Sequence, residues 1–206
     1  VGSEMCIRDR DNIVVMGIGE PFDNFTNLVK AIKILNCPKG IDLGSRRITI
    51  STCGIVPRIK EFADLDTQVN LAISLHAPNQ RIRETLMPIS KAYKMNELMD
   101  AVDYYISKTN RKVTMEYILL EGINDSIEDA KELAGLLKGK LVYVNLIPYN
   151  STSSNFKRSS KERINAFYDE LVKNKINVQM RREMGKGIKG CLLYTSDAAD
   201  DLTRVD

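Results

Sequence analysis

The sequence predicts one α/β domain built on a mainly parallel sheet. Short apolar runs rich in β-branched residues alternate with longer stretches whose apolar residues recur at helical intervals. The short runs are almost continuously apolar, which is typical of parallel strands covered by helices. With 206 residues, 43% of them hydrophobic and 28% charged, the chain has the length and composition of one globular domain.

Six runs are expected to be strands, and helices are expected between them. The expected strands are NIVVMGIG (12–19), RRITISTC (46–53), VNLAISLH (69–76), KVTMEYILL (112–120), LVYVNLIPY (141–149) and NVQMRRE (177–183). The expected helices cover 24–36, 55–65, 95–110, 126–139 and 160–174. Right-handed crossovers between parallel strands produce either a barrel or an open doubly wound sheet. The pattern leaves both arrangements open.

Polar or glycine-rich segments follow five of the expected strands. They are GIGEP, STCG, SLHAP, LLEGIND and IPYN, in chain order. In parallel α/β folds, ligands bind beyond the carboxyl ends of the strands. We therefore expect these five segments to line one binding site.

Within these segments, each candidate residue has a functional and a structural interpretation. Glu20 offers a carboxylate for a ligand ammonium group, or it caps a glycine turn. Ser51 offers a hydroxyl to a ligand, or it caps the helix that follows. His76 is the only histidine, so it forms no metal site alone and is either a ligand contact or a structural residue. Asn150 either pairs with a purine edge or occupies an ordinary turn.

Cysteine content and hydropathy limit the class of protein. The four cysteines are Cys6, Cys37, Cys53 and Cys191, and none is close enough to another to suggest a metal site or a disulfide framework. No apolar run reaches membrane-spanning length. We therefore expect a cytoplasmic protein. Most of the paired basic residues, among them Arg81 with Arg83, are expected to be solvated strand or helix ends, with a subset contacting phosphate.

The two ends of the chain differ from the rest and resemble translated sequencing adaptor. CLLYTS can be encoded by TGT CTC TTA TAC ACA TCT, and the reverse complement of that DNA encodes MCIRD in another frame. We therefore expect residues 1–10 and 191–206 to be non-native and residues 11–190 to be native. Residues 1–10 carry no net charge, and 191–206 carry one arginine and four aspartates, so the net charge of +3 becomes +6 for 11–190. Such a charge favours a polyanionic partner.

The ordered motifs resemble those of the radical S-adenosylmethionine RNA methyltransferases that methylate carbon 2 of adenosine in 23S ribosomal RNA and transfer RNA. The motifs are MGIGEP, RRITISTCGIVPRI, VNLAISLHAPNQRIRETLMPI, VTMEYILLEGINDS and VNLIPYN. The resemblance runs from about residue 12 to residue 188. It implies a partial (β/α) barrel of the radical S-adenosylmethionine type, with about six mainly parallel strands alternating with helices.

The resemblance also implies the residues that contact S-adenosylmethionine. The implied set is Gly19, Glu20, Ser51, Ser74, Leu75, His76 and Asn150, with the Glu20 carboxylate facing the methionine amine. The chain departs from the family's STSG element by having Cys53 in place of the second serine.

The family's cluster-binding CxxxCxxC motif, which holds a [4Fe–4S] cluster, has no counterpart in this sequence. A cysteine near the C-terminus carries the methyl group in the family, but Cys191 sits one place early and is assigned to the adaptor. We therefore expect a fragment that is inactive alone and has no catalytic residue of its own. We also expect it to be monomeric.

Three alternatives stay open from the sequence. The first is the sister activity at carbon 8 of adenine, which shares these motifs. The second is a non-catalytic RNA-binding barrel, against which the set of Glu20, Ser51, Ser74, His76 and Asn150 argues, because RNA binding alone does not require it. The third is another radical S-adenosylmethionine activase, which would lack salt-dependent RNA binding.

Overall fold

The computed structural model describes residues 12–16, 19–65, 67–150 and 156–181. Within them, six strands form one sheet, and every neighbouring pair is parallel. The strands are β1 (Ile13–Val15), β2 (Ile48–Thr52), β3 (Asn70–Ser74), β4 (Val113–Leu119), β5 (Val142–Pro148) and β6 (Val178–Met180). The six expected strands are confirmed, each a few residues shorter than its apolar run.

Helices connect consecutive strands, as the sequence predicts. They are η1 (Pro21–Asn24), α2 (Phe25–Leu35), η2 (Ser45–Arg47), α3 (Val56–Asp64), α4 (Gln80–Leu86), α5 (Ile89–Ala92), α6 (Met95–Thr109), α7 (Ile127–Leu137) and α8 (Lys161–Lys173). Local capping explains where two of them begin. The Ser126 side chain accepts from Asp129 N ahead of α7, and the Ser160 side chain accepts from Arg163 N ahead of α8.

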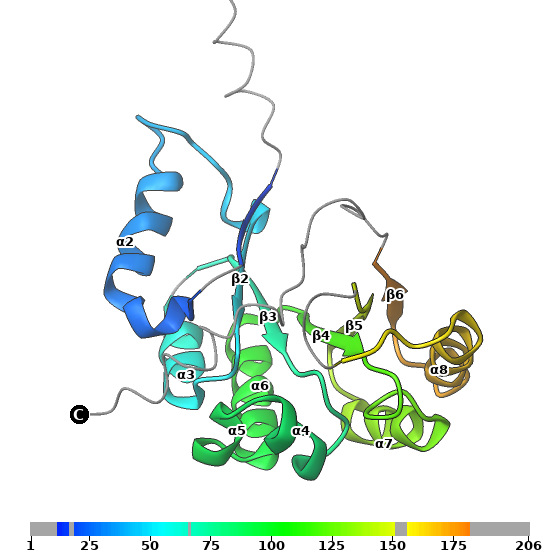
Figure 1. The fold of residues 1–206 in the computed structure, drawn as a ribbon. Coiled ribbons are helices and arrows are strands. Elements are labelled where there is room, and N and C mark those ends of the chain that lie inside the picture. The colour runs from blue at the N-terminus through cyan, green and yellow to red at the C-terminus, as the bar shows by residue number, and fades with distance from the viewer. Residues whose placement is uncertain (1–11, 17–18, 66, 151–155, 182–206) are drawn as a thin grey trace, which may run out of the picture.

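Strand order decides between the barrel and the open sheet. A doubly wound sheet reverses its strand order, so that helices cover both faces. In the described sheet the order follows the sequence from β1 to β6, with those two strands at its edges. Right-handed crossovers then place the helices on one face, and Figure 1 shows α3, α6, α7 and α8 around the outer side of the curved sheet. The fold is a partial barrel.

The two faces of the sheet differ in chemistry. On the outer face, apolar side chains such as Ile50, Ile73, Met115 and Val144 are fully buried and belong to one core cluster with the apolar faces of the helices. The inner face carries a polar row across four strands, whose members are register partners: Ser74, Glu116, Asn145 and Gln179. The partial barrel therefore has an apolar outer layer and an inner face that combines this polar row with a small apolar cluster around Ile118 and Leu120.

None of the helices in the described part of the chain is long and apolar enough to cross a membrane.

Candidate functional site

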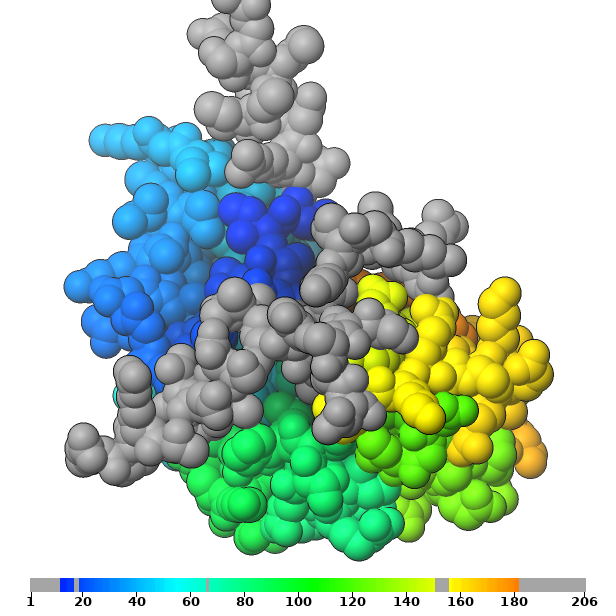
Figure 2. All heavy atoms as spheres, viewed as in Figure 1, coloured from blue at the N-terminus to red at the C-terminus, as the bar shows by residue number. Residues whose placement is uncertain are grey.

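The expected ligand-contacting residues lie where the strands end, at the carboxyl ends of β1 to β5, which together form the carboxyl edge of the sheet. All strands run parallel, so their carboxyl ends share that edge. It carries Gly19 and Glu20 after β1, Ser51 as the second-last residue of β2, Ser74 at the end of β3, and then Leu75 and His76. Asn150 lies two residues beyond β5, is partly buried and has an interaction within the chain. In the view of Figure 2, the first described segments (blue) lie on the left, the region of α4 to α6 (green) at the bottom and the start of α8 (yellow) on the right.

Glu20 links the loop after β1 to the loop after β2. Its carboxylate is 8% exposed; Oε1 accepts from Phe22 N at 3.0 Å and caps η1, and Oε2 accepts from Cys53 N at 2.6 Å. A carboxylate has about four acceptor positions, so these two bonds leave capacity for a ligand. Gly19 has a φ of +86°, a left-handed conformation that turns the chain into this contact.

Arg83 on α4 lies beneath the same edge. It is an exception to the expectation that most paired basic residues are solvated, because it is 0% exposed. The guanidinium Nη2 donates to Cys53 O at 2.6 Å and to Ser74 O at 3.4 Å. Burial lowers the pKa of Arg83 to about 10, which leaves it charged at neutral pH. Glu20, the main chain of Cys53 and Arg83 thus connect the loops after β1, β2 and β3.

His76 occupies a strained and buried position. Its φ is +54°, in a region that costs a non-glycine residue about 1–2 kcal/mol. The ring is 3% exposed and Nδ1 accepts from Ile118 N at 3.2 Å, so the proton of the neutral ring sits on Nε2. Burial, followed by the charge of Arg83, lowers the pKa of His76 to about 3. His76 is therefore a neutral hydrogen-bonding group, unsuited to exchanging protons near pH 7.

Leu75 contributes through its main chain. Its side chain is fully buried in the core cluster, and its N–H donates to Glu116 O at 3.0 Å. The N–H of His76 donates to the same carbonyl oxygen at 3.2 Å. The SLH segment is thereby fixed against β4.

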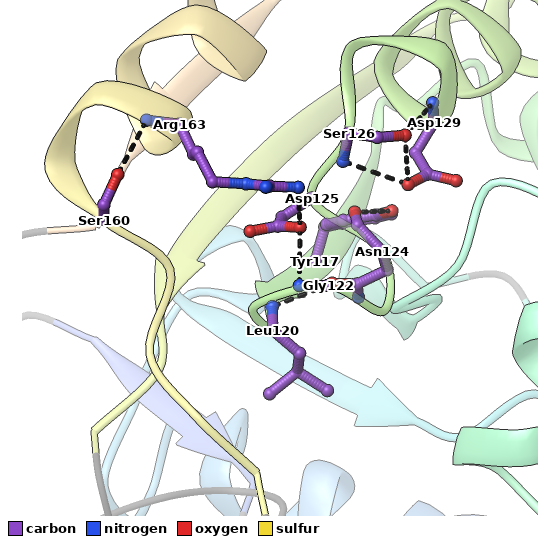
Figure 3. A network of polar contacts seen from close by, with 9 residues as sticks. All are labelled: Tyr117, Leu120, Gly122, Asn124, Asp125, Ser126, Asp129, Ser160 and Arg163. Atoms are coloured by element: carbon purple, nitrogen blue, oxygen red, sulfur yellow. Dashed lines mark hydrogen bonds and ion pairs between the residues drawn. The ribbon is translucent and has the colours of Figure 1, made fainter.

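Asn124 holds the loop after β3 to the loop after β4, and the sequence interpretation missed it. Its side chain is 0% exposed; Nδ2 donates to His76 O and to Ile118 O, and Oδ1 accepts from Leu120 N, each at 2.8 Å. Tyr117 Oη donates to the Asn124 carbonyl at 2.8 Å (Figure 3). The only signal in the sequence was its place in the loop segment LLEGIND, whose side chains no periodicity singles out.

Asp125 ties the same loop to α8. Its side chain is 1% exposed, and Oδ1 accepts from Gly122 N at 2.9 Å and from Arg163 Nη2 at 2.7 Å (Figure 3). The other oxygen, Oδ2, is buried and has no hydrogen-bond partner. The Arg163 side chain is 45% exposed, so water screens this ion pair on one side only.

Glu116 is a second residue that the sequence interpretation missed. It is 4% exposed on the inner face of β4, and Oε2 accepts from Asn145 Nδ2 at 2.9 Å. Burial raises the pKa of Glu116, while Asn145 and Arg181 act in the opposite direction. In the sequence, Glu116 interrupts the apolar run VTMEYIL at one alternate position, which was the available signal.

The described residues do not provide a metal centre. In the described part of the chain, no three His, Cys, Asp or Glu side chains come together to hold a metal ion. Cys37 is exposed and Cys53 is partly buried, and burial together with Glu20 raises the pKa of the Cys53 thiol. Cys191 and the expected boundaries at residues 10 and 190 lie outside the described residues.

Comparison with known proteins gives a family and close relatives. The sequence model of the radical SAM superfamily matches residues 4–134. A probable dual-specificity RNA methyltransferase RlmN from Spiroplasma citri is 62% identical over 178 residues, which are 86% of this chain and 51% of the relative. The protein of the same name from Acholeplasma laidlawii is 56% identical over 178 residues, which are 86% of this chain and 53% of that relative. The chain thus spans about half the length of these curated relatives.

Solved structures agree with the fold. The crystal structure of a radical SAM methyltransferase from Sphaerobacter thermophilus has a TM-score of 0.83 and 44% identity, and covers 92% of this chain and 54% of that one. A domain of a pyruvate-formate lyase-activating enzyme from Bacteroides vulgatus has a TM-score of 0.64 at 15% identity, with 83% of this chain and 99% of that one covered. This second likeness concerns the fold alone.

Proposed function

The chain belongs to the radical SAM superfamily, and from that premise we propose that it is part of an RNA methyltransferase that modifies carbon 2 of adenosine in 23S ribosomal RNA and transfer RNA. The observation that carries this proposal is the identity of 51–62% to relatives named as dual-specificity RNA methyltransferases. The net charge of +6 over residues 11–190 suits an RNA partner. Such substrates would place the protein in the cytoplasm.

The residues at the carboxyl edge suit S-adenosylmethionine. The Glu20 carboxylate has acceptor capacity for the methionine ammonium group, and Ser51 and Ser74 carry hydroxyl groups within reach of the same edge. Neutral His76 adds the Nε2 hydrogen-bond donor to the proposed site, and Asn150 adds a side-chain amide. Gly19 and Leu75 complete the proposed set through their main chains. When bound, S-adenosylmethionine supplies the methyl group and, in this superfamily generally, radical chemistry.

The described residues do not fit a [4Fe–4S] cluster, because cluster ligation needs several thiolates and only Cys37 and Cys53 are described, 16 positions apart in the sequence. We therefore assign no step of the reaction to these residues through a cluster. The proposal instead predicts that the 206-residue chain alone does not methylate RNA.

The test uses the genomic sequence on either side of residues 11–190. The longer protein that it encodes is reconstituted under reducing conditions with ribosomal RNA, and the modified base is identified by mass spectrometry. We expect 2-methyladenosine. A product methylated at carbon 8, or RNA binding without any binding of S-adenosylmethionine, would overturn the proposal.

A further inference from the structure

We propose that Arg83 is a positioning residue of the S-adenosylmethionine site, which fixes the main chains after β2 and β3 in the arrangement that the ligand needs. The inference rests on the proposed function for the identity of the ligand. Arg83 reaches both main chains through one nitrogen, Nη2, which donates to Cys53 O and Ser74 O. These carbonyls belong to the STCG and SLH segments.

The Arg83 guanidinium is an unusual choice for a purely structural role. Its Nε and Nη1 atoms are buried and have no hydrogen-bond partner among the residues that the structure describes. Among the described residues, no carboxylate shifts its pKa; the Cys53 thiol raises it, but the pKa of that thiol is itself raised, which keeps the thiol protonated. A buried cation without a counter-ion destabilises a fold, and apolar residues of similar volume often replace such groups without loss. Stability alone would therefore favour a methionine at position 83.

The local backbone leaves room for this guanidinium. Gly54 has a φ of +109°, and a Cβ atom there would lie 3.2 Å from Arg83 Nη2 and 3.1 Å from Leu98 Cδ1. The glycine thus allows the loop after β2 to close over Arg83. On the other side of that loop, Glu20 accepts from Cys53 N. The main chain of Cys53 is consequently held on both sides, at its N–H by a carboxylate and at its carbonyl oxygen by a guanidinium.

Arg83 also acts on His76 through its charge. Its positive charge is the second cause, after burial, that keeps the imidazole neutral. A neutral ring with its proton on Nε2 offers one fixed donor at the site. This coupling gives a readout that a change in packing alone does not produce.

The test compares Arg83→Met, Arg83→Lys and Arg81→Met in the longer protein that carries this chain, reconstituted with its cluster. Arg81 is the matched control, because it lies on the same helix and is exposed. Equilibrium dialysis measures the Kd for S-adenosylmethionine. We expect Arg83→Met to weaken binding about 10- to 100-fold, the range for a hydrogen bond to a charged group. Arg83→Lys keeps the charge and should recover part of this loss, and Arg81→Met should bind as wild type does.

The second measurement follows the pKa of His76 by NMR of histidine-labelled protein, with the signal assigned from its loss in His76→Gln. Arg83→Met should raise this pKa, because burial remains and the like charge is gone, whereas Arg83→Lys should leave it low. Equal binding by Arg83→Met and wild type would overturn the inference, as would an unchanged pKa of His76. If Arg83→Met does not fold, the Kd of Arg83→Lys for S-adenosylmethionine is compared with that of wild type. Weaker binding by Arg83→Lys then supports the inference, and equal binding overturns it. Failure of the wild-type protein to bind S-adenosylmethionine would instead overturn the proposed function.

Discussion

Replacing Asn124 by alanine should strongly destabilise the fold, because one side chain satisfies three buried main-chain groups. The substitution leaves His76 O, Ile118 O and Leu120 N without these bonds, each of which measures 2.8 Å. A buried polar group that loses its partner costs about 1–3 kcal/mol. The three losses share one site and relax together, so we expect a total of about 3–5 kcal/mol. That is a large part of the ~5–15 kcal/mol that stabilises a typical domain.

Urea unfolding followed by circular dichroism measures this loss as a lower midpoint at unchanged slope. Asn165→Ala is the control, because Asn165 is an exposed residue of α8. Its free energy of unfolding should stay within about 0.5 kcal/mol of wild type. If Asn124→Ala costs less than about 1 kcal/mol, the three bonds do not hold the two loops together, and the reasoning from orphaned buried groups fails here.

Three further predictions concern buried ionisable groups. Arg163→Ala should cost about 1–3 kcal/mol in urea unfolding, because Asp125 stays buried with one oxygen already unpartnered, and an unchanged midpoint would contradict this. The pKa of Glu116 is raised in the folded state, so the wild-type protein loses stability as the pH rises from about 4.5, the ordinary value, through the folded pKa. The free energy of unfolding of Glu116→Gln, measured in urea, should therefore exceed that of wild type by more at pH 7.5 than at pH 4. His76 has a pKa of about 3, below its unfolded value, so stability falls as pH drops below about 6.5, and its NMR signal in folded wild type should show no titration between pH 7.5 and pH 5.

The sheet could be predicted from the sequence, and the curvature of the sheet could not be predicted from pattern alone. Apolar runs such as VYVNLIP identify strands because burial on a helix-covered face requires them. Strand order depends on which runs pair, and pairing is a long-range property that one sequence does not display. Resemblance to a family suggested the barrel, and the sequential parallel order of β1 to β6 gives its physical reason.

The candidate site was predicted in part for a similar reason. Glu20 and His76 were accessible to prediction because they follow apolar strands, where parallel folds place their ligands. Arg83 was missed because α4, with the sequence QRIRETL, is mostly polar, so the segment has the composition of a solvated helix. Asn124 was missed because its partners are main-chain atoms of two other segments. Contacts of this kind have no periodicity.

The missed residues explain why the carboxyl edge behaves as one unit. Glu20 accepts from Cys53 N and Arg83 donates to Cys53 O, so both hold the main chain of Cys53. Asn124 joins His76 to the loop after β4. The loops after β1 to β4 are therefore connected by side chains, of which Arg83 and Asn124 would not themselves have to contact the ligand. A ligand that binds one of these loops encounters the others already in place, so less conformational entropy is lost on binding. Buried charge and a left-handed histidine lower the stability of this edge, and preorganisation of the site is the property that they provide in return.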